Sequence, residues 1–326
     1  MISKERNKRQ ISWVSSHSEL SKTISQSRRM VGHDYRLPAV YMVTISVAGN
    51  KPAFGKICEA DESHNTPWMC PNELGAKVIS LWNKIPEIYP QINSRCFQLM
   101  PSHIHGILHV REAMPFHLGH VIAQFKAACT KELALYSETL SRNTLWKKGF
   151  NDRIIFGDRK LQNWINYLYD NPRRLWIRQN SRELFIINRN IHIGENTVNI
   201  MGNKLLLEYP NKIQVKCSRR MNDEEIENLW QQVAKEMGEG SVFISPCISR
   251  GEKEIMRRLF AAEQPQIVIM ENGFSPMVKP QGRQFDACAK GRLLLVAPWE
   301  HHNEQRTITR QQCLFLNRLA STICEL

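Results

Sequence analysis

The run Met100-Pro101-Ser102-His103-Ile104-His105-Gly106-Ile107-Leu108-His109 limits strongly what this chain can fold into. Apolar, β-prone residues dominate the run, and two imidazoles stand two residues apart within it. Because side chains alternate between the two faces of a strand, His103 and His105 project to one face and Ile104 to the other. We therefore expect a β-strand that offers two nitrogen ligands to a metal ion from one face.

A third histidine, His109, falls on the same face of that strand. A histidine-triad nucleotide hydrolase would need its third histidine at the next alternate position, which is Ile107 here. The sequence therefore excludes that class of enzyme. A structural pair of strand histidines, with no metal, is the plainer alternative for His103 and His105.

A second pattern follows in the run Trp164-Ile165-Asn166-Tyr167-Leu168-Tyr169-Asp170-Asn171-Pro172. Tyr167 and Asn171 are four residues apart, so they share one face of a helix that Pro172 is expected to end. Tyr169 lies about 200° around that helix from Tyr167, so the two cannot point into one pocket. A phenol with an ordinary pKa near 10 needs a metal or a base to lose its proton on attack. The spacing favours Tyr167 as a nucleophile, with a core tyrosine as the alternative.

These two patterns resemble the hallmarks of the REP-associated tyrosine transposases, a branch of the single-tyrosine HUH endonucleases. Those hallmarks read Met-Pro-Asn-His-hydrophobic-His and, later, Tyr-Ile-x-x-Asn-Pro. The chain matches them at residues 100–105 and 167–172, and it departs at Ser102, where the family usually has Asn. Residues 118–126 and 145–152 also look like the elements that link the two motifs in the family.

The resemblance covers about residues 36–180 and implies a ferredoxin-like α+β HUH domain with an antiparallel sheet. It implies that Tyr167 attacks a phosphate of single-stranded, hairpin-containing DNA and forms a 5′-phosphotyrosine. It also implies that the two strand histidines hold Mg²⁺ or Mn²⁺, with Asn171 as the third ligand, because the family's third ligand has that offset from its tyrosine.

Charge is divided unequally along the chain. Residues 1–180 hold 25 Lys and Arg against 14 Asp and Glu, whereas residues 181–326 hold 19 against 17. Since a polyanion is bound mainly by neutralising its phosphates, the first half is the part expected to meet nucleic acid. The candidate contacts are Lys126, Lys147, Lys148, Arg153, Arg173 and Arg174, with Trp146, Trp164 and Trp176 available for base stacking. For any one of these cations, an ordinary solvated side chain is the alternative.

The length of 326 residues favours two domains. We expect a basic arm at 1–35, the HUH domain at 36–180, a linker at 181–201, a second domain at 202–300 and a helical tail at 301–326. The expected strands lie at 39–47, 95–100, 103–110, 152–156, 213–217, 241–245, 267–270 and 293–296, and the expected helices at 73–85, 116–138, 158–171, 223–237 and 252–262. Alternation of strands and helices in the second domain predicts an α/β Rossmann-like parallel sheet.

The second half resembles the nucleotide-binding-like fold of the DNA-processing protein A family. Residues 245–254 and 271–276 carry this resemblance, which extends over about a hundred residues. The usual Gly-rich phosphate loop is missing, and Ser249-Arg250-Gly251 stands in its place. At a helix N-terminus these three residues could bind an anion through backbone N–H groups. Ordinary helix capping is the alternative.

The nine cysteines form no Cys-x-x-Cys pair, which argues against a zinc knuckle and suits a reducing cytosol. No apolar stretch approaches the ~20 residues needed to span a bilayer. We therefore expect a cytoplasmic protein, associated with the nucleoid when bound to DNA, whose partner is single-stranded or hairpin DNA. Whether it forms a homodimer is left open.

The hypothesis that fits these patterns is a metal-dependent DNA endonuclease and strand transferase, like a transposase. One alternative is a domesticated protein that binds repetitive palindromes and acts as a repressor. Another is a nucleotide-binding regulator whose first domain only tethers DNA. The presence of His103, His105 and Tyr167 favours an enzyme, because binding alone would not need them.

Overall fold

The computed structural model describes residues 29–136, 145–276, 278–304 and 307–326. The chain divides into two compact units, one up to Trp176 and one from Ile177 onwards. Residues 1–28 of the expected arm lie outside the described residues, as do the last two residues of the helix expected at 116–138. Tyr35, at the end of the expected arm, is instead buried and donates a hydrogen bond to Asp152.

The first unit is built on a four-stranded antiparallel sheet with strand order β4-β5-β1-β6. Its strands are β1 (Ala39–Ser46), β4 (Ile92–Met100), β5 (His103–Val110) and β6 (Asn151–Ile155), and a separate two-stranded sheet pairs β2 (Gly55–Cys58) with β3 (Trp68–Pro71). Its helices are α2 (Glu73–Asn83), α3 (Ile85–Ile88), α4 (Leu118–Tyr136) and α5 (Asp158–Asn180). The strand expected at 103–110 is confirmed with those bounds.

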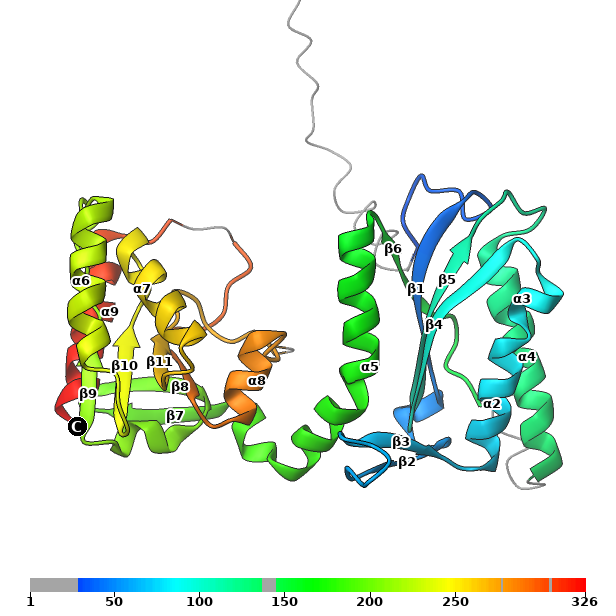
Figure 1. Ribbon diagram of the computed structural model, residues 1–326, viewed down its shortest axis with the longest axis horizontal. Coiled ribbons are helices and arrows are strands. Elements are labelled where there is room, and N and C mark those ends of the chain that lie inside the picture. Colours follow the sequence, from blue (N-terminus) through cyan, green and yellow to red (C-terminus); the bar gives the residue numbers. More distant parts are fainter. Residues whose placement is uncertain (1–28, 137–144, 277, 305–306) are drawn as a thin grey trace, which may run out of the picture. The chain divides into compact units, whose positions relative to one another are not determined.

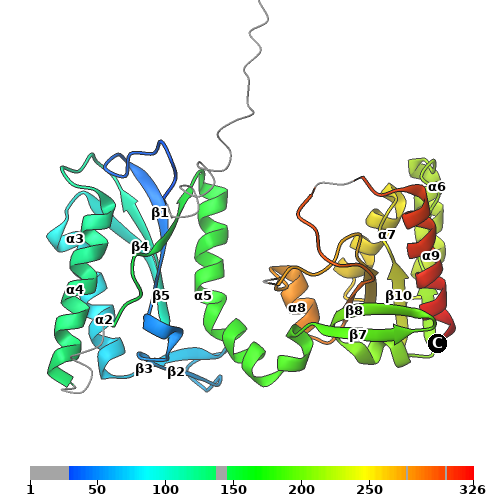
Figure 2. The same ribbon diagram turned by 180° about the vertical axis from the view of Figure 1, so that it is seen from behind.

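Alternating side chains give this sheet two different apolar faces. Ile104 and Leu108 of β5 belong to the main core, which α2 and α4 cover. Ile107 points the other way and packs with Leu168 of α5. Figures 1 and 2 show the sheet between α5 on one side and α2 and α4 on the other. Because His103 and His105 alternate in step with Ile107, both histidines lie on the α5 face.

Helix α5 continues through Pro172, so the expectation that Pro172 ends the helix was wrong. Proline lacks the N–H that would bond the carbonyl of Leu168, a loss that costs a helix interior about 3 kcal/mol. Pro172 and Leu168 are buried, and Trp164 packs in the same apolar cluster. Burial of this face against the sheet offsets the lost hydrogen bond, and α5 therefore continues past Pro172 to Asn180.

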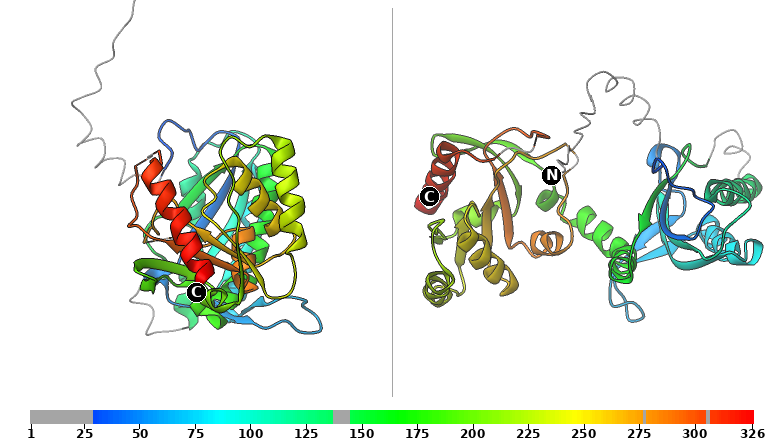
Figure 3. Two further views of the ribbon diagram at one scale, coloured as in Figure 1. Left: turned by 90° about the vertical axis from the view of Figure 1, so that its left-hand side faces the viewer. Right: turned by 90° about the horizontal axis from the view of Figure 1, so that it is seen from above.

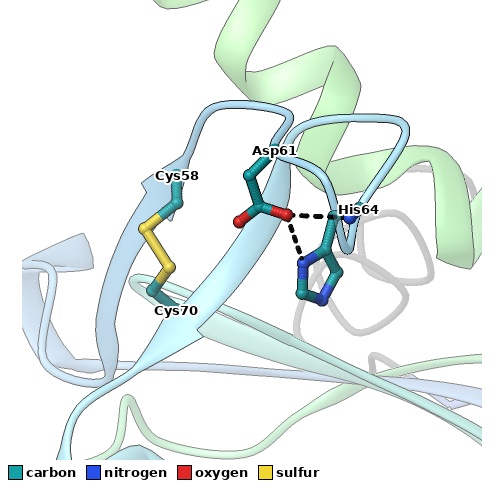
Figure 4. The surroundings of a disulfide bond; sticks show 4 residues. All are labelled: Cys58, Asp61, His64 and Cys70. Atoms are coloured by element: carbon teal, nitrogen blue, oxygen red, sulfur yellow. Dashed lines mark hydrogen bonds and ion pairs between the residues drawn. A yellow bond between two sulfur atoms is a disulfide. The ribbon is translucent and has the colours of Figure 1, made fainter.

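The hairpin of β2 and β3 carries a disulfide between Cys58 and Cys70 (Figure 4). The cysteine pattern suits a reducing cytosol and does not signal this bond, because a separation of 12 residues forms no recognisable motif. Only the pairing of the two strands brings these thiols together. In the loop between the strands, Asp61 accepts hydrogen bonds from the backbone and the ring of His64 (Figure 4). The other seven cysteines are free.

The second unit contains a six-stranded sheet with strand order β7-β8-β12-β11-β10-β9. Its strands are β7 (Asn188–Ile193), β8 (Asn196–Gly202), β9 (Asn211–Gln214), β10 (Ser241–Ser245), β11 (Gln266–Ile269) and β12 (Leu293–Ala297). Strands β9 to β12 are parallel, as expected, but β8 joins β12 in the antiparallel direction and β7 follows it. The segment expected to be a linker, residues 181–201, thus supplies a hairpin that completes a mixed sheet.

Helices cover both faces of this second sheet: α6 (Asp223–Lys235), α7 (Arg250–Ala261), α8 (Arg283–Ala289) and α9 (Arg310–Glu325). Val242 and Ile244 of β10 pack in the cluster that includes α9, whereas Phe243 packs with α6 and α7. Figure 3 shows α9 on one side of the sheet and α6 and α7 on the other. Asn222 and Glu225 form the capping box that begins α6.

Gly106 of β5 lies against the fully buried indole of Trp82. A Cβ at this position would come within 2.1 Å of Trp82 Cζ2. We expect Gly106→Ala to lower the free energy of unfolding by about 1–3 kcal/mol, because the indole must move within a packed core. Urea denaturation followed by tryptophan fluorescence measures this loss. As a control, a Cβ at Gly238 meets no atom within 4 Å, so Gly238→Ala should leave the urea midpoint unchanged. An unchanged urea midpoint for Gly106→Ala would contradict the close packing of Gly106 against Trp82.

Candidate metal and nucleic-acid site

The two histidines of β5 converge on one point at the α5 face. Their Nε2 atoms are 3.1 Å apart, and their rings are nearly perpendicular, at 82°. Two nitrogen ligands, each about 2.1 Å from one ion and at a right angle to each other, lie about 3.0 Å apart. The separation of the Nε2 atoms therefore suits two neighbouring ligands of one cation.

Burial keeps this pair neutral. Desolvation lowers the pKa of His105 to about 3, with the nearby His103 adding to the effect. Burial also lowers the pKa of His103. Both rings are therefore uncharged at pH 7, when an imidazole can bind a metal. The Oγ1 of Thr44 lies 2.8 Å from His105 Nδ1 and can accept a hydrogen bond from it, which leaves the His105 Nε2 lone pair available.

Asn171 is the residue expected to complete the ligand set. Its Nδ2 is buried and has no hydrogen-bond partner within the described residues, a state that costs about 1–3 kcal/mol. In the same residues, no group of three or more His, Cys, Asp and Glu could hold a metal ion. A third protein ligand would therefore be a neutral oxygen such as the amide oxygen of Asn171. Two imidazoles and one amide oxygen are the ligand set that the family resemblance implies for Mg²⁺ or Mn²⁺.

The two tyrosines of α5 have different surroundings. Tyr169 shares a hydrogen bond with the Cys96 thiol on β4, and this contact raises the pKa of Tyr169. Tyr167 is 39% exposed, meets the edge of Trp164, and has the Arg174 guanidinium 5.7 Å from its ring centre. Within the described chain, the Tyr167 hydroxyl has no hydrogen-bond partner. Tyr169 therefore has a structural partner, whereas the Tyr167 hydroxyl is accessible.

A hollow of about 210 Å³ adjoins the histidine pair. It is lined by Thr44, Ser46, Lys147, Lys148, Gly149, Phe150 and Asn151. Thr44 connects it to the pair through the contact with His105. Two of the expected DNA contacts, Lys147 and Lys148, thus lie beside the expected metal ligands.

The remaining expected cations are engaged with the protein. The Lys126 ammonium donates to the carbonyl oxygens of Lys147 at 2.8 Å and Gly149 at 3.0 Å. The Arg153 guanidinium lies 5.1 Å from the ring centre of Trp164. Lys126 therefore supports the loop that follows Trp146. Arg153 remains exposed on β6.

Arg173 and Arg174 share one carboxylate. Arg173 donates two hydrogen bonds to Asp170, at 2.5 and 3.1 Å, and Arg174 lies 3.6 Å from the same group. Arg174 is also buried. Their charges are therefore partly neutralised within α5, which weakens the expectation that both contact DNA.

In the second unit, the anion site expected at Ser249, Arg250 and Gly251 already contains a carboxylate of this chain. The buried Glu252 accepts hydrogen bonds from the backbone N–H groups of residues 248 and 249, at 2.6 and 3.1 Å. The Ser249 hydroxyl accepts from Glu252 N, which completes a capping box, and Arg250 is paired with Asp223. Ser249 and Glu252 therefore form the capping box that the capping alternative expects, and the Glu252 carboxylate uses the N–H groups of residues 248 and 249.

Three residues that line the hollow, Thr44, Ser46 and Asn151, were not predicted from the sequence. Strand pairing places Thr44 opposite His105 and Ser46 opposite His103. Alternation along residues 39–46 signals that Thr44 and Ser46 share a face. Only the register between β1 and β5 shows that this face is the one that carries the histidines.

Along the described parts of the chain, no helix combines the length and apolar character needed to cross a membrane.

No family model matches the chain. An uncharacterized protein of Haemophilus influenzae is 26% identical over 167 residues, which cover 45% of this chain and 87% of that protein. A REP-associated tyrosine transposase bound to a REP hairpin has a TM-score of 0.31 at 14% identity, over 44% of this chain and 72% of that one.

Two structures of DNA processing protein A are also similar. The protein from Helicobacter pylori, described for its single-stranded DNA binding mode, has a TM-score of 0.29 at 16% identity, over 44% of this chain and 67% of that one. The protein from Streptococcus pneumoniae has a TM-score of 0.32 at 15% identity, over 52% of this chain and 60% of that one.

Proposed function

We propose that the first unit is a metal-dependent single-stranded DNA endonuclease and strand transferase that acts on hairpin-containing DNA. The observation that carries this proposal is the convergence of His103 and His105 on the sheet face covered by α5, the helix of Tyr167. A two-imidazole cation site and an accessible phenol are the groups that an attack on a phosphodiester requires. The basic composition of residues 1–180 supports a polyanionic substrate.

The direction of α5 supports a shared site for these groups. Strand β6 is parallel to β5, since both are antiparallel to β1. Helix α5 follows β6 and runs back along the sheet in the opposite direction (Figure 1). Leu168 packs with Ile107. Asn171 comes about 4.5 Å after Leu168 along the helix, and His105 comes about 6.6 Å before Ile107 along the strand. Because the helix and the strand run in opposite directions, these two displacements point the same way, which supports a similar level on the sheet for Asn171 and His105.

We also infer the finer classes of fold. The succession β1, α2, β4, β5, α4, β6 with strand order β4-β5-β1-β6 supports a ferredoxin-like first unit. The parallel strands β9 to β12, joined by α6, α7 and α8, support a Rossmann-like second unit. A nucleotide-binding role for that unit has less support, because Glu252 occupies the N-terminus of α7.

In the proposed reaction, the Tyr167 oxygen attacks the scissile phosphorus and the bond from phosphorus to the 3′ oxygen breaks. The phenol proton is lost, and the departing 3′ oxygen gains a proton, so a 3′-OH and a 5′-phosphotyrosine result. His103, His105 and Asn171 would hold the divalent ion, which when bound polarises a non-bridging phosphate oxygen. Lys147 and Lys148 would offset the charge of the strand. Attack by a second 3′-OH on the phosphotyrosine reverses these steps and joins the strands.

Incubation of the full chain with a hairpin-containing single-stranded oligonucleotide and Mn²⁺ should yield an adduct that survives boiling in SDS. Because the 5′ phosphate stays on the protein, a label at the 3′ end should migrate with the protein. A label at the 5′ end should appear on a shorter free strand. An adduct that carries the 5′ label would contradict this chemistry. Hairpin binding without any adduct would favour the alternative of a palindrome-binding repressor.

A further inference from the structure

The hollow beside the histidine pair has the chemistry of an anion site. Three neutral side chains that can donate hydrogen bonds line it together with two lysines: Thr44, Ser46, Asn151, Lys147 and Lys148. Neither Asp nor Glu is among its lining residues. The neighbouring carboxylate on β6, Asp152, alternates to the other face of the sheet, where Arg29 and Tyr35 bind it. Ammonium and hydroxyl groups are donors that suit phosphate oxygens.

The turn that carries the two lysines is held from two directions. The backbone N–H of Lys147 donates to the carbonyl oxygen of Ser46 at 2.9 Å, which ties the turn to the end of β1. From α4, the Lys126 ammonium donates to the carbonyl oxygens of Lys147 and Gly149. These two carbonyls lie on either side of Lys148, so the partly exposed ammonium of Lys126 holds the turn that presents both lysines.

Thr44 links the hollow to the histidine pair. When His105 offers Nε2 to a cation, its Nδ1 carries the proton and donates to Thr44 Oγ1. The hydroxyl proton of Thr44 must then point away from His105. The same hydroxyl-bearing side chain also lines the hollow. A phosphate in the hollow would therefore be separated from the cation site by the side chains of Thr44 and His105.

We propose that this hollow binds the backbone phosphate next to the one that Tyr167 attacks, and that Lys126 is the positioning residue that shapes it. The inference rests on the proposed function of the histidine pair. Holding two consecutive phosphates sets the register of the strand, because the phosphate in the hollow decides which bond faces Tyr167. Lys147 and Lys148 supply the charged contacts.

The test measures the affinity of the full chain carrying Tyr167→Phe, in EDTA, for a hairpin-containing single-stranded oligonucleotide. One phosphate at a time is replaced by a neutral methylphosphonate. One linkage should be critical, with affinity about 5- to 10-fold lower when its charge is lost, as for a charge-assisted contact. Adding Lys147→Ala and Lys148→Ala should remove that penalty. It should also reduce the slope of log affinity against log salt by about 0.7 for one lost phosphate contact.

Variants of Lys126 separate positioning from charge. Lys126→Met removes both hydrogen bonds to the turn and should weaken the preference for the critical linkage, whereas Lys126→Arg can still donate and should keep most of it. Lys84→Ala removes an exposed lysine at the end of α2, away from the hollow, and should leave the critical linkage unchanged. Because Lys147 and Lys148 are exposed, their variants test the hollow even if Lys126→Met fails to fold.

Two outcomes would overturn the phosphate subsite: equal penalties at every linkage, or a penalty that survives in the variant without Lys147 and Lys148. Either result is compatible with adduct formation by the protein with Tyr167 intact. Conversely, a critical linkage that depends on the two lysines, together with no adduct in Mn²⁺, would overturn the proposed cleavage and support phosphate binding in the hollow alone. If cleavage does occur, the critical linkage should adjoin the nick.

Discussion

Tyr167→Phe is expected to abolish the covalent protein–DNA adduct while hairpin affinity stays within about twofold of the unmodified chain. The substitution removes the one oxygen that attacks in the proposed reaction, and the remaining phenyl ring has no nucleophilic atom to replace it. It removes no cation, so the electrostatic part of DNA binding is retained. Denaturing gels with a 3′-labelled hairpin measure the adduct, and fluorescence anisotropy measures the affinity.

Tyr169→Phe is the matched control, because it makes the same chemical change on the same helix. Tyr169 shares its hydrogen bond with Cys96, so this variant should lose a little stability and keep the adduct. The two tyrosines point to different sides of α5, about 200° apart. Loss of the adduct in Tyr169→Phe alone would reverse the assignment of the nucleophile.

His103→Ala and His105→Ala should each remove cleavage and the stabilisation by Mn²⁺. A ligand that binds only the folded state adds about 2.7 kcal/mol to its stability at 100 times the dissociation constant. For a unit of this size such a gain corresponds to a rise of about 5–10 °C in the thermal midpoint. Each variant loses one of the two converging Nε2 atoms, so Mn²⁺ should leave its midpoint unchanged. Differential scanning calorimetry with and without Mn²⁺ checks both results.

His109→Ala provides the control for this pair. His109 lies on the same strand and face, but it lies beside Arg95, whose Nη2 is 3.4 Å from His109 Nδ1. Its loss should leave both the Mn²⁺ effect and cleavage intact. Full cleavage by the unmodified chain in EDTA would contradict the metal site.

Elements with a strong local pattern were predictable. The bounds of β5 and the shared face of its histidines follow from strand alternation, which depends on a few neighbouring residues. The capping box at Asn222 and Glu225 is also a local signal. The end of α5 was not predictable, because burial of Leu168 and Pro172 against the sheet outweighs the local effect of proline.

The sequence by itself determined that two imidazoles share one face of a strand and that Tyr167 and Asn171 share one face of a helix. Tertiary structure alone decided that the histidine face of β5 packs against α5 through Ile107 and Leu168, that Thr44 pairs with His105, and that Lys126 holds the turn with Lys147. The physical reason is distance along the chain. Strand alternation and helical rotation depend on a few neighbouring residues, so the sequence reveals them. Strand register and the packing of a helix on a sheet join segments that are far apart in the sequence, so a local pattern cannot predict them.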